Sequence, residues 1–437
     1  MSQSLLGEDA ARKNVNYLAS LDFIVSLGFG LIMPLFPVYV DLLGGGGLEV
    51  GILFSSFVFT RALLAAPFGN LSDRLGRKNI ILVGSVMYAV LALLFTVPDT
   101  WFGLIFVRAG QGVASAMVWP VSEALVIDST PAHKRGASMG KIVMASNLGF
   151  VVGPFVGGAL FIFASQSLGY AESDAYKFPF YFTAALALVG SVLTWLYVTD
   201  AKAPEKTRTA LSLKGLFSPP GVPPERLRTL RILYLNASIE GFSFASIGPL
   251  MVLFLGFRFE LDAGTISILI GVSMGLGALI AFPSGRIADR VGRKVLFVVG
   301  GYVAFTAIFF IPFFYSLLLV ILLLAARSMA FQVSSPALRA LQADIVPEHV
   351  RGRLIGLLES MMNMGSVVGA PLGGFLWDQF HGRDFGLPLG IDGTVVPFVI
   401  SGIMGITTVM MVHLTVKEAK RVKAGEEELP NPPDDCM

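Results

Sequence analysis

Cysteine, histidine and charge are all scarce in this sequence of 437 residues. The single cysteine, Cys436, excludes an internal disulfide, and the four histidines, His133, His349, His381 and His413, show no paired ligand spacing. We therefore expect no metal site and no bound cofactor. Charged residues make up only 14% of the chain. No nucleophile, general base or phosphate-binding loop has a polar domain in which to lie, so the sequence argues against an enzyme.

Apolar residues, by contrast, are abundant. They make up 54% of the chain, and the mean hydropathy is +0.73, more than a soluble domain can bury. A helix needs about 20 residues to cross roughly 30 Å of hydrocarbon. We find twelve apolar runs of about that length, at about 17–41, 48–69, 79–97, 101–127, 138–166, 178–198, 230–256, 263–284, 294–314, 316–343, 353–377 and 393–415. The first run is too long for a signal-peptide core, so we expect it to stay in the mature protein.

The basic residues predict the orientation of these spans. Short cytoplasmic loops accumulate lysine and arginine, and most of the 32 basic residues fall on one side if both termini are cytoplasmic. Only Lys177, Arg258 and Arg383 fall in loops on the other side. We therefore expect a multi-pass protein of the cell membrane with both termini in the cytoplasm. Because the basic residues lie mainly in the loops between spans, they give no reason to expect nucleic-acid binding.

The sequence repeats itself at one constant shift along the chain. The segment from Gly69 to Lys78 falls on the segment from Gly285 to Lys294, and at the same shift the segment from Asn147 to Gly158 falls on the one from Asn363 to Gly374. A unit of six spans used twice in the same orientation explains this repeat. The sequence thus predicts an all-α polytopic membrane protein with twelve transmembrane helices in two pseudo-symmetric six-helix bundles.

The domain boundaries follow from the repeat and from composition. We expect an amino-terminal bundle at 1–198, a cytoplasmic linker at 199–229 and a carboxy-terminal bundle at 230–415. Residues 416–437 are acidic and rich in proline, which predicts a disordered cytoplasmic tail.

Two repeated loops join long apolar helices on the predicted cytoplasmic side, and they read GNLSDRLGRK and GRIADRVGRK. Their glycines permit tight turns, and their charged residues can pair with the ends of neighbouring helices. The basic residues of one such loop could simply reflect the excess of lysine and arginine in cytoplasmic loops. Two copies at the same offset, however, resemble the loop signature of the major facilitator superfamily. That resemblance implies a cytoplasmic latch built from these loops and the ends of the helices beside them: Gly69, Asp73, Arg74, Gly76, Arg77, Lys78, Asp128, Gly285, Asp289, Arg290, Gly292, Arg293 and Asp344.

The fourth run carries RAGQGVASA, which is similar to a fourth-helix motif of that superfamily in which the arginine is implicated in proton coupling. Arg108, Gln111, Ser115 and Trp119 recur at helical spacing and form one polar stripe. Such a stripe has to face protein or a water-filled cavity. The alternative is that Arg108 only anchors to backbone carbonyls near the membrane surface.

The fifth run carries GFVVGPFVGG, whose small residues allow close helix packing while its proline removes a hydrogen-bond donor. Generic packing would explain the glycines. The pattern also resembles the antiporter signature of the superfamily, and it is formed by Gly149, Gly153, Pro154, Gly157 and Gly158. LGFGLIMPLFP in the first run is similar to a motif of the twelve-helix drug:proton antiporter branch.

Ionisable groups inside the spans are few. A charge at the centre of a bilayer costs roughly 2.5 to 3.5 kcal/mol on insertion scales, so each such group needs a partner, a cavity or a function. Asp22, Glu123, Glu240 and Glu359 are candidates for carrying protons, together with Arg108. Pairing with Arg61, Arg327 or Arg339 is an equally good interpretation of any one carboxylate. The residues expected to line the substrate cavity are polar or aromatic and lie in these spans: Gln111, Ser115, Trp119, Asn147, Asn236, Arg327 and Asn363.

These observations predict a monomeric secondary transporter that exchanges protons for a small hydrophobic or cationic solute by alternating access in the lipid bilayer. Two alternatives stay open. The same fold could serve an uptake symporter or an exporter of a sugar, a siderophore or another metabolite. It could also serve a membrane receptor that transports nothing.

Overall fold

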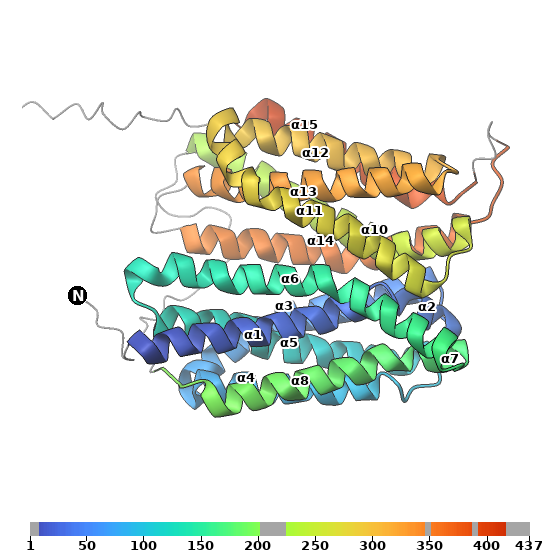
Figure 1. The fold of residues 1–437 in the computed structure, drawn as a ribbon. Coiled ribbons are helices and arrows are strands. Elements are labelled where there is room, and N and C mark those ends of the chain that lie inside the picture. The colour runs from blue at the N-terminus through green and yellow to red at the C-terminus, as the bar shows by residue number, and fades with distance from the viewer. Residues whose placement is uncertain (1–7, 202–223, 346–350, 387–391, 417–437) are drawn as a thin grey trace, which may run out of the picture.

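The structure is a computed structural model that describes residues 8–201, 224–345, 351–386 and 392–416 (Figure 1). Within these ranges, the side chains at 8, 224–226, 281–290, 340, 343–345 and 351–353 are not described. The expected tail at 417–437 and most of the expected linker lie outside the described residues. The described part of the chain is nearly all helix, as the apolar runs predict.

The first half consists of six long helices and short connecting elements. The long helices are α1 (Glu8–Ile32), α3 (Gly47–Leu75), α4 (Arg77–Leu94), α5 (Trp101–Ser129), α6 (Arg135–Ile162) and α8 (Lys177–Tyr197). The connecting elements are α2 (Phe36–Leu42), η1 (Ala132–Lys134), η2 (Phe163–Ser167) and α7 (Glu172–Ala175).

The second half repeats this plan. Its long helices are α10 (Pro224–Phe259), α11 (Ala263–Val291), α12 (Arg293–Phe310), α13 (Leu317–Ile345), α14 (Arg351–Phe380) and α15 (Val395–Thr415), with η3 (Ile311–Phe313) between α12 and α13. The helix α10 begins within the stretch that the sequence assigns to the linker. The end of the molecule at which α8 ends and α10 begins is called the linker end below, and α1 also begins there (Figure 1).

In the described part of the chain, eleven helices are long and apolar enough to cross a membrane. The remaining expected span is α14, whose 30 residues are also long enough for a crossing. It packs mainly against α10 and α3, and Gly365 and Gly374 allow its close approach to these two helices. The predicted fold class of two six-helix bundles is confirmed.

Backbone geometry repeats along with the sequence. Gly76 and Gly292, which correspond under the repeat, both have a positive φ, 92° and 103°, and each separates two long helices. A Cβ at Gly149 would lie 2.5 Å from the carbonyl oxygen of Phe23, and one at the corresponding Gly365 would overlap the carbonyl oxygen of Ser238. Gly149 and Gly365 are separated by the full shift of the repeat, whereas Phe23 and Ser238 are separated by one residue less. The repeat therefore holds in space, with a one-position offset between α1 and α10.

The two halves meet at the end opposite the linker end. There the first turns of α3 pack against the last turns of α14, and the last turns of α6 pack against the first turns of α11. Glycines allow the helices of the two halves to pack this closely. A Cβ at Gly51 would overlap the carbonyl oxygen of Ala370, and one at Gly158 would lie 2.6 Å from the carbonyl oxygen of Gly264. Nearer the linker end, a Cβ at Gly69 would have no described atom within 4 Å. Among the described residues, the close contacts between the halves thus gather at the opposite end.

Candidate functional site

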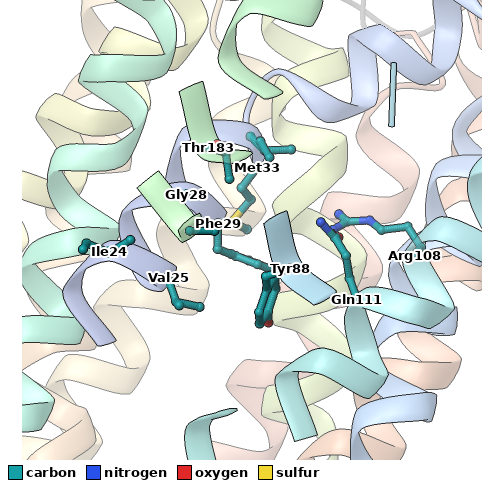
Figure 2. Close-up of a pocket in the computed structure, with 11 residues that line it drawn as sticks. Ile24, Val25, Gly28, Phe29, Met33, Tyr88, Arg108, Gln111 and Thr183 are labelled. Carbon is teal, nitrogen blue, oxygen red and sulfur yellow. The ribbon is translucent and has the colours of Figure 1, made fainter. Parts of the chain in front are cut away.

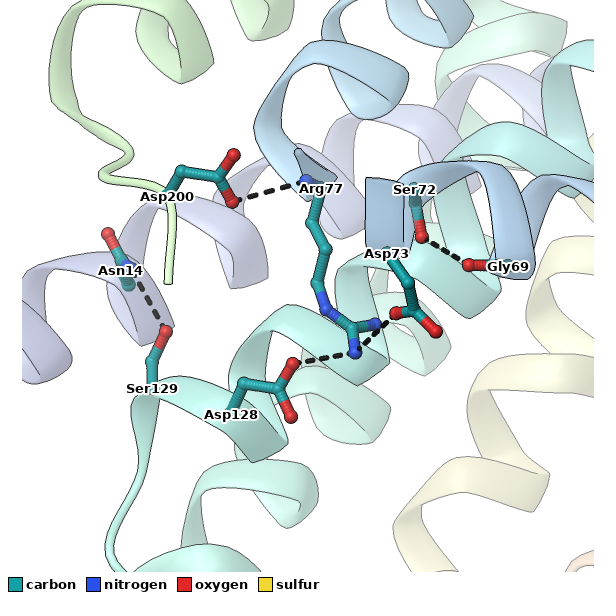
Figure 3. A network of polar contacts seen from close by, with 8 residues as sticks. All are labelled: Asn14, Gly69, Ser72, Asp73, Arg77, Asp128, Ser129 and Asp200. Carbon is teal, nitrogen blue, oxygen red and sulfur yellow. Dashed lines mark hydrogen bonds and ion pairs between the residues drawn. The ribbon is translucent and has the colours of Figure 1, made fainter. Parts of the chain in front are cut away.

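Arg77 is the centre of a polar network at the linker end (Figure 3). Its guanidinium lies 3.1 Å from a carboxylate oxygen of Asp73 and 2.6 Å from one of Asp128. The side chain is only 3% exposed. The turn at Gly76 brings the backbone N–H of Arg77 to Asp200, whose carboxylate accepts a hydrogen bond at 3.1 Å. The structure thus joins α3, α4 and α5 through the residues that the sequence assigns to the first latch.

The second copy of this loop is described only in part. Gly292 has the same positive φ as Gly76. Gly285, Asp289, Arg290 and Asp344 fall within α11 and α13, but they lie outside the described side chains, so their latch role stays a prediction.

Arg108 lies inside the first half, in an aromatic cage. Its guanidinium carbon is 4.0 Å from the ring centre of Phe36 and within 6 Å of the ring centres of Phe29, Phe57 and Phe95. Arg108 donates a hydrogen bond of 3.0 Å to the side-chain oxygen of Gln111. The residue is 3% exposed, and its Nε has no hydrogen-bond partner in the part of the chain that the structure describes.

The cage stabilises the guanidinium but supplies no counter-charge. Each cation–aromatic contact gains about 0.5 to 2 kcal/mol, and removing a guanidinium from water costs several kcal/mol. Among the described residues, no carboxylate forms an ion pair with Arg108. This cation is therefore buried without a counter-charge from the described chain.

A cavity opens beside Arg108 between α1, α4, α5 and α8 (Figure 2). Its lining residues are Ile24, Val25, Gly28, Phe29, Ile32, Met33, Tyr88, Arg108, Gln111, Thr183 and Ala187. In Figure 2 the guanidinium of Arg108 and the amide of Gln111 lie together on one side of the cavity.

A second cavity lies in the second half between α10, α12 and α13. Its ionisable and amide groups are Asn236, Glu240 and Arg327, and the remainder of the lining is mostly aromatic and aliphatic. Glu240 and Arg327 are half-buried. The structure thus brings together one predicted proton carrier and two predicted cavity residues.

Two further predicted carboxylates belong to different halves, and their charges interact. Glu123 on α5 is exposed, and its charge interacts with Glu359 on α14 and Arg339 on α13, which belong to the second half. It also interacts with Arg61 on α3. Asp22 is 1% exposed within the first half, and its charge interacts with Glu123.

An aromatic cluster that the sequence analysis does not predict connects four helices of the first half. Phe29, Phe57, Trp119 and Phe150 come from α1, α3, α5 and α6, and their ring centres are 5.3 to 6.3 Å apart in the contacting pairs. The guanidinium of Arg61 lies 4.7 Å from the Trp119 ring. Only Trp119 carries a signal in the sequence, through its place in the polar stripe, since single phenylalanines in apolar runs carry no positional information.

The glycine-rich fifth span packs against both halves. A Cβ at Gly153 would lie 2.6 Å from the backbone nitrogen of Leu31, and Gly157 faces the carbonyl of the same residue. Gly158 instead faces α11 of the second half. Pro154 lies inside α6 and is buried. The expected motif therefore fixes α1 against α6 and also contributes to the contact between the halves.

The remaining predicted cavity residues do not form one site. Gln111 and Ser115 are buried within the first half, Asn147 is exposed on α6, and Asn363 is half-buried on α14.

Comparisons with known proteins agree on one family. The family description Major Facilitator Superfamily matches residues 18–236 and 233–434. Multidrug resistance protein 1 of Bacillus subtilis is 26% identical over 401 residues, covering 88% of this chain and 96% of the relative. Quinolone resistance protein NorA of Staphylococcus aureus is 24% identical over 403 residues, covering 85% and 91%. An uncharacterised transporter from Methanocaldococcus jannaschii is 28% identical, covering 84% and 92%.

Solved structures agree in fold. A bacterial homologue of the human lysosomal transporter Spinster, in an inward-facing and unoccupied conformation, superposes with a TM-score of 0.70 at 16% identity, covering 94% of this chain and 96% of that one. The nucleoside transporter NupG superposes with a TM-score of 0.72 at 15% identity, covering 93% and 100%.

Proposed function

Because the chain belongs to the Major Facilitator Superfamily, a family of membrane transporters, we propose that it is a proton-coupled antiporter that exports a small hydrophobic or cationic solute. Two relatives that align over most of their length bear the names of a multidrug resistance protein and a quinolone resistance protein. The glycine pattern from Gly149 to Gly158, which resembles the antiporter signature, supports exchange rather than uptake.

The observation that carries the proposal is the electrostatic interaction between ionisable groups of the two halves. Glu123 of the first half interacts with Glu359 and Arg339 of the second. A proton on Glu123 removes both its repulsion from Glu359 and its attraction to Arg339, so the electrostatic energy between the halves depends on protonation. Protonation therefore changes the relative free energy of the open and closed arrangements, which is what coupling to a proton gradient requires.

The transport cycle follows from where the halves touch. Contacts gather at the opposite end, and we propose that the linker end faces the cytoplasm, in line with the distribution of basic residues. This arrangement would then admit solute from the cytoplasm. Rocking of the halves would close the linker end, where the network around Arg77 is placed to steady α3, α4 and α5 in the outward-facing state.

The test is transport in proteoliposomes with an imposed pH gradient and a fluorescent cationic dye. We expect dye movement that follows the gradient and is abolished by a protonophore. Glu123→Gln, Glu359→Gln, Glu240→Gln and Asp22→Asn are then compared singly. If all four variants keep proton-driven transport at the wild-type rate, the carboxylates do not couple protons and the assignment fails.

The same preparation separates the alternative functions. Dye or sugar accumulation that runs with the proton gradient would indicate a symporter. Ligand binding without flux of any probe would indicate a receptor.

A further inference from the structure

The cavity beside Arg108 has the chemistry of an anion site. Arg108 points a guanidinium into it, and the Nε of that group finds no hydrogen-bond acceptor among the described residues. Gln111 accepts from Arg108 through its side-chain oxygen, so its amide nitrogen is left to donate. Figure 2 shows the guanidinium of Arg108 beside the amide of Gln111, so this wall offers N–H donors and one positive charge. The hydroxyls of Tyr88 and Thr183 also line the cavity, and neither carries a charge that balances Arg108.

No described carboxylate balances Arg108. The 11 residues that line the cavity include no aspartate and no glutamate. The rings of Phe36, Phe29 and Phe57 surround the guanidinium, but their faces carry only partial negative charge and cannot accept the hydrogen bonds of Nε in good geometry. A buried charge of this kind requires a counter-charge or an acceptor.

The cavity of the second half differs in that its lining includes a carboxylate. Gln111 and Arg327 correspond under the repeat, and they line the two cavities. Val25 and Glu240 correspond under the one-position offset that relates α1 to α10, and they line the same two cavities. The second cavity thus contains a cation and a carboxylate, whereas the first contains a cation and a valine in place of the carboxylate.

We propose that the cavity formed by α1, α4, α5 and α8 binds a small anion with a single negative charge on Arg108 and Gln111. The anion supplies the counter-charge that the described residues do not give to Arg108. The cavity is far smaller than a drug-sized pocket, so the ligand is chloride or a short carboxylate such as acetate. This inference concerns a site inside one bundle, and it does not depend on proton coupling or on the direction of transport.

The experiment measures thermal unfolding of the purified full chain in detergent at constant ionic strength. Sodium gluconate is replaced stepwise by sodium chloride in one arm and by sodium acetate in the other. An anion that binds only the folded state raises the unfolding midpoint in a saturable way, by about 2 to 5 °C at high occupancy. The arm that saturates at lower concentration distinguishes a free halide from a carboxylate.

Substitutions locate the site. Arg108→Gln should remove the saturable rise. Arg108→Lys keeps the charge but loses the planar guanidinium, so the anion concentration at half-saturation should increase about tenfold. Arg327→Gln, which removes the guanidinium of the second cavity, should leave it unchanged. A wild-type protein with no saturable rise over gluconate in either arm, or an Arg108→Gln variant with the full rise, overturns the proposal.

Val25→Glu tests the same idea in the opposite direction. It places a carboxylate where the second half has Glu240, so the cation is balanced internally and the dependence on added anion should disappear. If this variant folds and still shows the wild-type anion response, the proposed position of the anion is wrong. Should Val25→Glu fail to fold, Gln111→Leu provides the second measurement: loss of one donor should weaken the response, and an unchanged response would overturn the proposed site.

Discussion

The carboxylate of Asp378 caps the first turn of α3, although the two lie in different halves of the molecule. One carboxylate oxygen accepts a hydrogen bond from the backbone N–H of Gly47 and the other accepts one from Leu48, each at 2.7 Å. The first turn of a helix has unsatisfied N–H groups and a partial positive charge. This contact therefore ties α14 to α3 where the halves meet.

We expect Asp378→Asn to loosen the opposite end. The neutral amide keeps one acceptor and loses the charge, which costs about 1 kcal/mol, or about a fivefold shift in the population of the open arrangement. The measurement is the labelling rate of Ser55→Cys by a membrane-impermeant maleimide in a Cys436→Ser background, since Ser55 donates to the carbonyl of Val367 across the same contact.

Asp174→Asn is the matched control for this change. Asp174 lies at the same end, but it pairs with Lys177 inside the first half at 2.8 Å. Its substitution should leave the labelling rate unchanged. Equal labelling in Asp378→Asn and the parent protein would show that the cap does not hold this end closed.

Close packing at the same end predicts a second effect. A side chain at Gly51 would overlap the carbonyl oxygen of Ala370, whereas a Cβ at Gly140 on α6 meets no described atom within 4 Å. Gly51→Val should therefore prevent the halves from approaching, with transport lowered at least about tenfold and the opposite end labelled readily. Gly140→Ala should have little effect. A Gly51→Val variant with normal transport would mean that these contacts are dispensable.

Arg77 gives a prediction about stability. It is buried between Asp73 and Asp128, so Arg77→Gln leaves two carboxylates close together without their cation, and we expect a loss of about 3 to 5 kcal/mol. Arg12 pairs with Asp9 on the surface, where both side chains are more than three-quarters exposed. Arg12→Gln should cost less than about 0.5 kcal/mol. Chemical or thermal unfolding in detergent compares the two, and similar losses would contradict the buried network.

A substitution at Asp73 distinguishes a role of the latch in turnover from a role in the stability of the fold. Its carboxylate is partly exposed and shares Arg77 with Asp128, so Asp73→Asn removes one of two partners. We expect slower turnover with little change in solute affinity, because the residue lies at the linker end and lines neither cavity. Initial rates over a range of dye concentrations in proteoliposomes provide both quantities. A loss of affinity alone would rule out the latch role.

The sequence predicts the helices and the two halves well because those features depend on local composition. The apolar runs, the constant shift of the repeat and the repeated loops are sufficient for the fold, and the structure brings Asp73, Arg77 and Asp128 together as the family resemblance implies. The cap by Asp378 could not be predicted, because its partners are backbone groups in the other half of the chain. The aromatic cage around Arg108 was equally hidden, since each of its phenylalanines is ordinary within its own apolar run.

The final prediction concerns two charged residues that correspond under the internal repeat. Glu123 and Arg339 occupy corresponding positions, so one half has an acid where the other has a base, and their charges interact across the halves. Glu123→Arg alone adds a base near Arg61, and Arg339→Glu alone adds an acid near Glu123 and Glu240. Each single change should lower proton-driven transport about tenfold or more. The double exchange restores opposite charges. A transport rate within about threefold of wild type in the double variant would show that the two residues are energetically coupled, as expected for neighbouring charges. Losses that simply multiply in the double variant would show that the two residues act independently, and the proposed role of this pair in coupling the halves would then be lost.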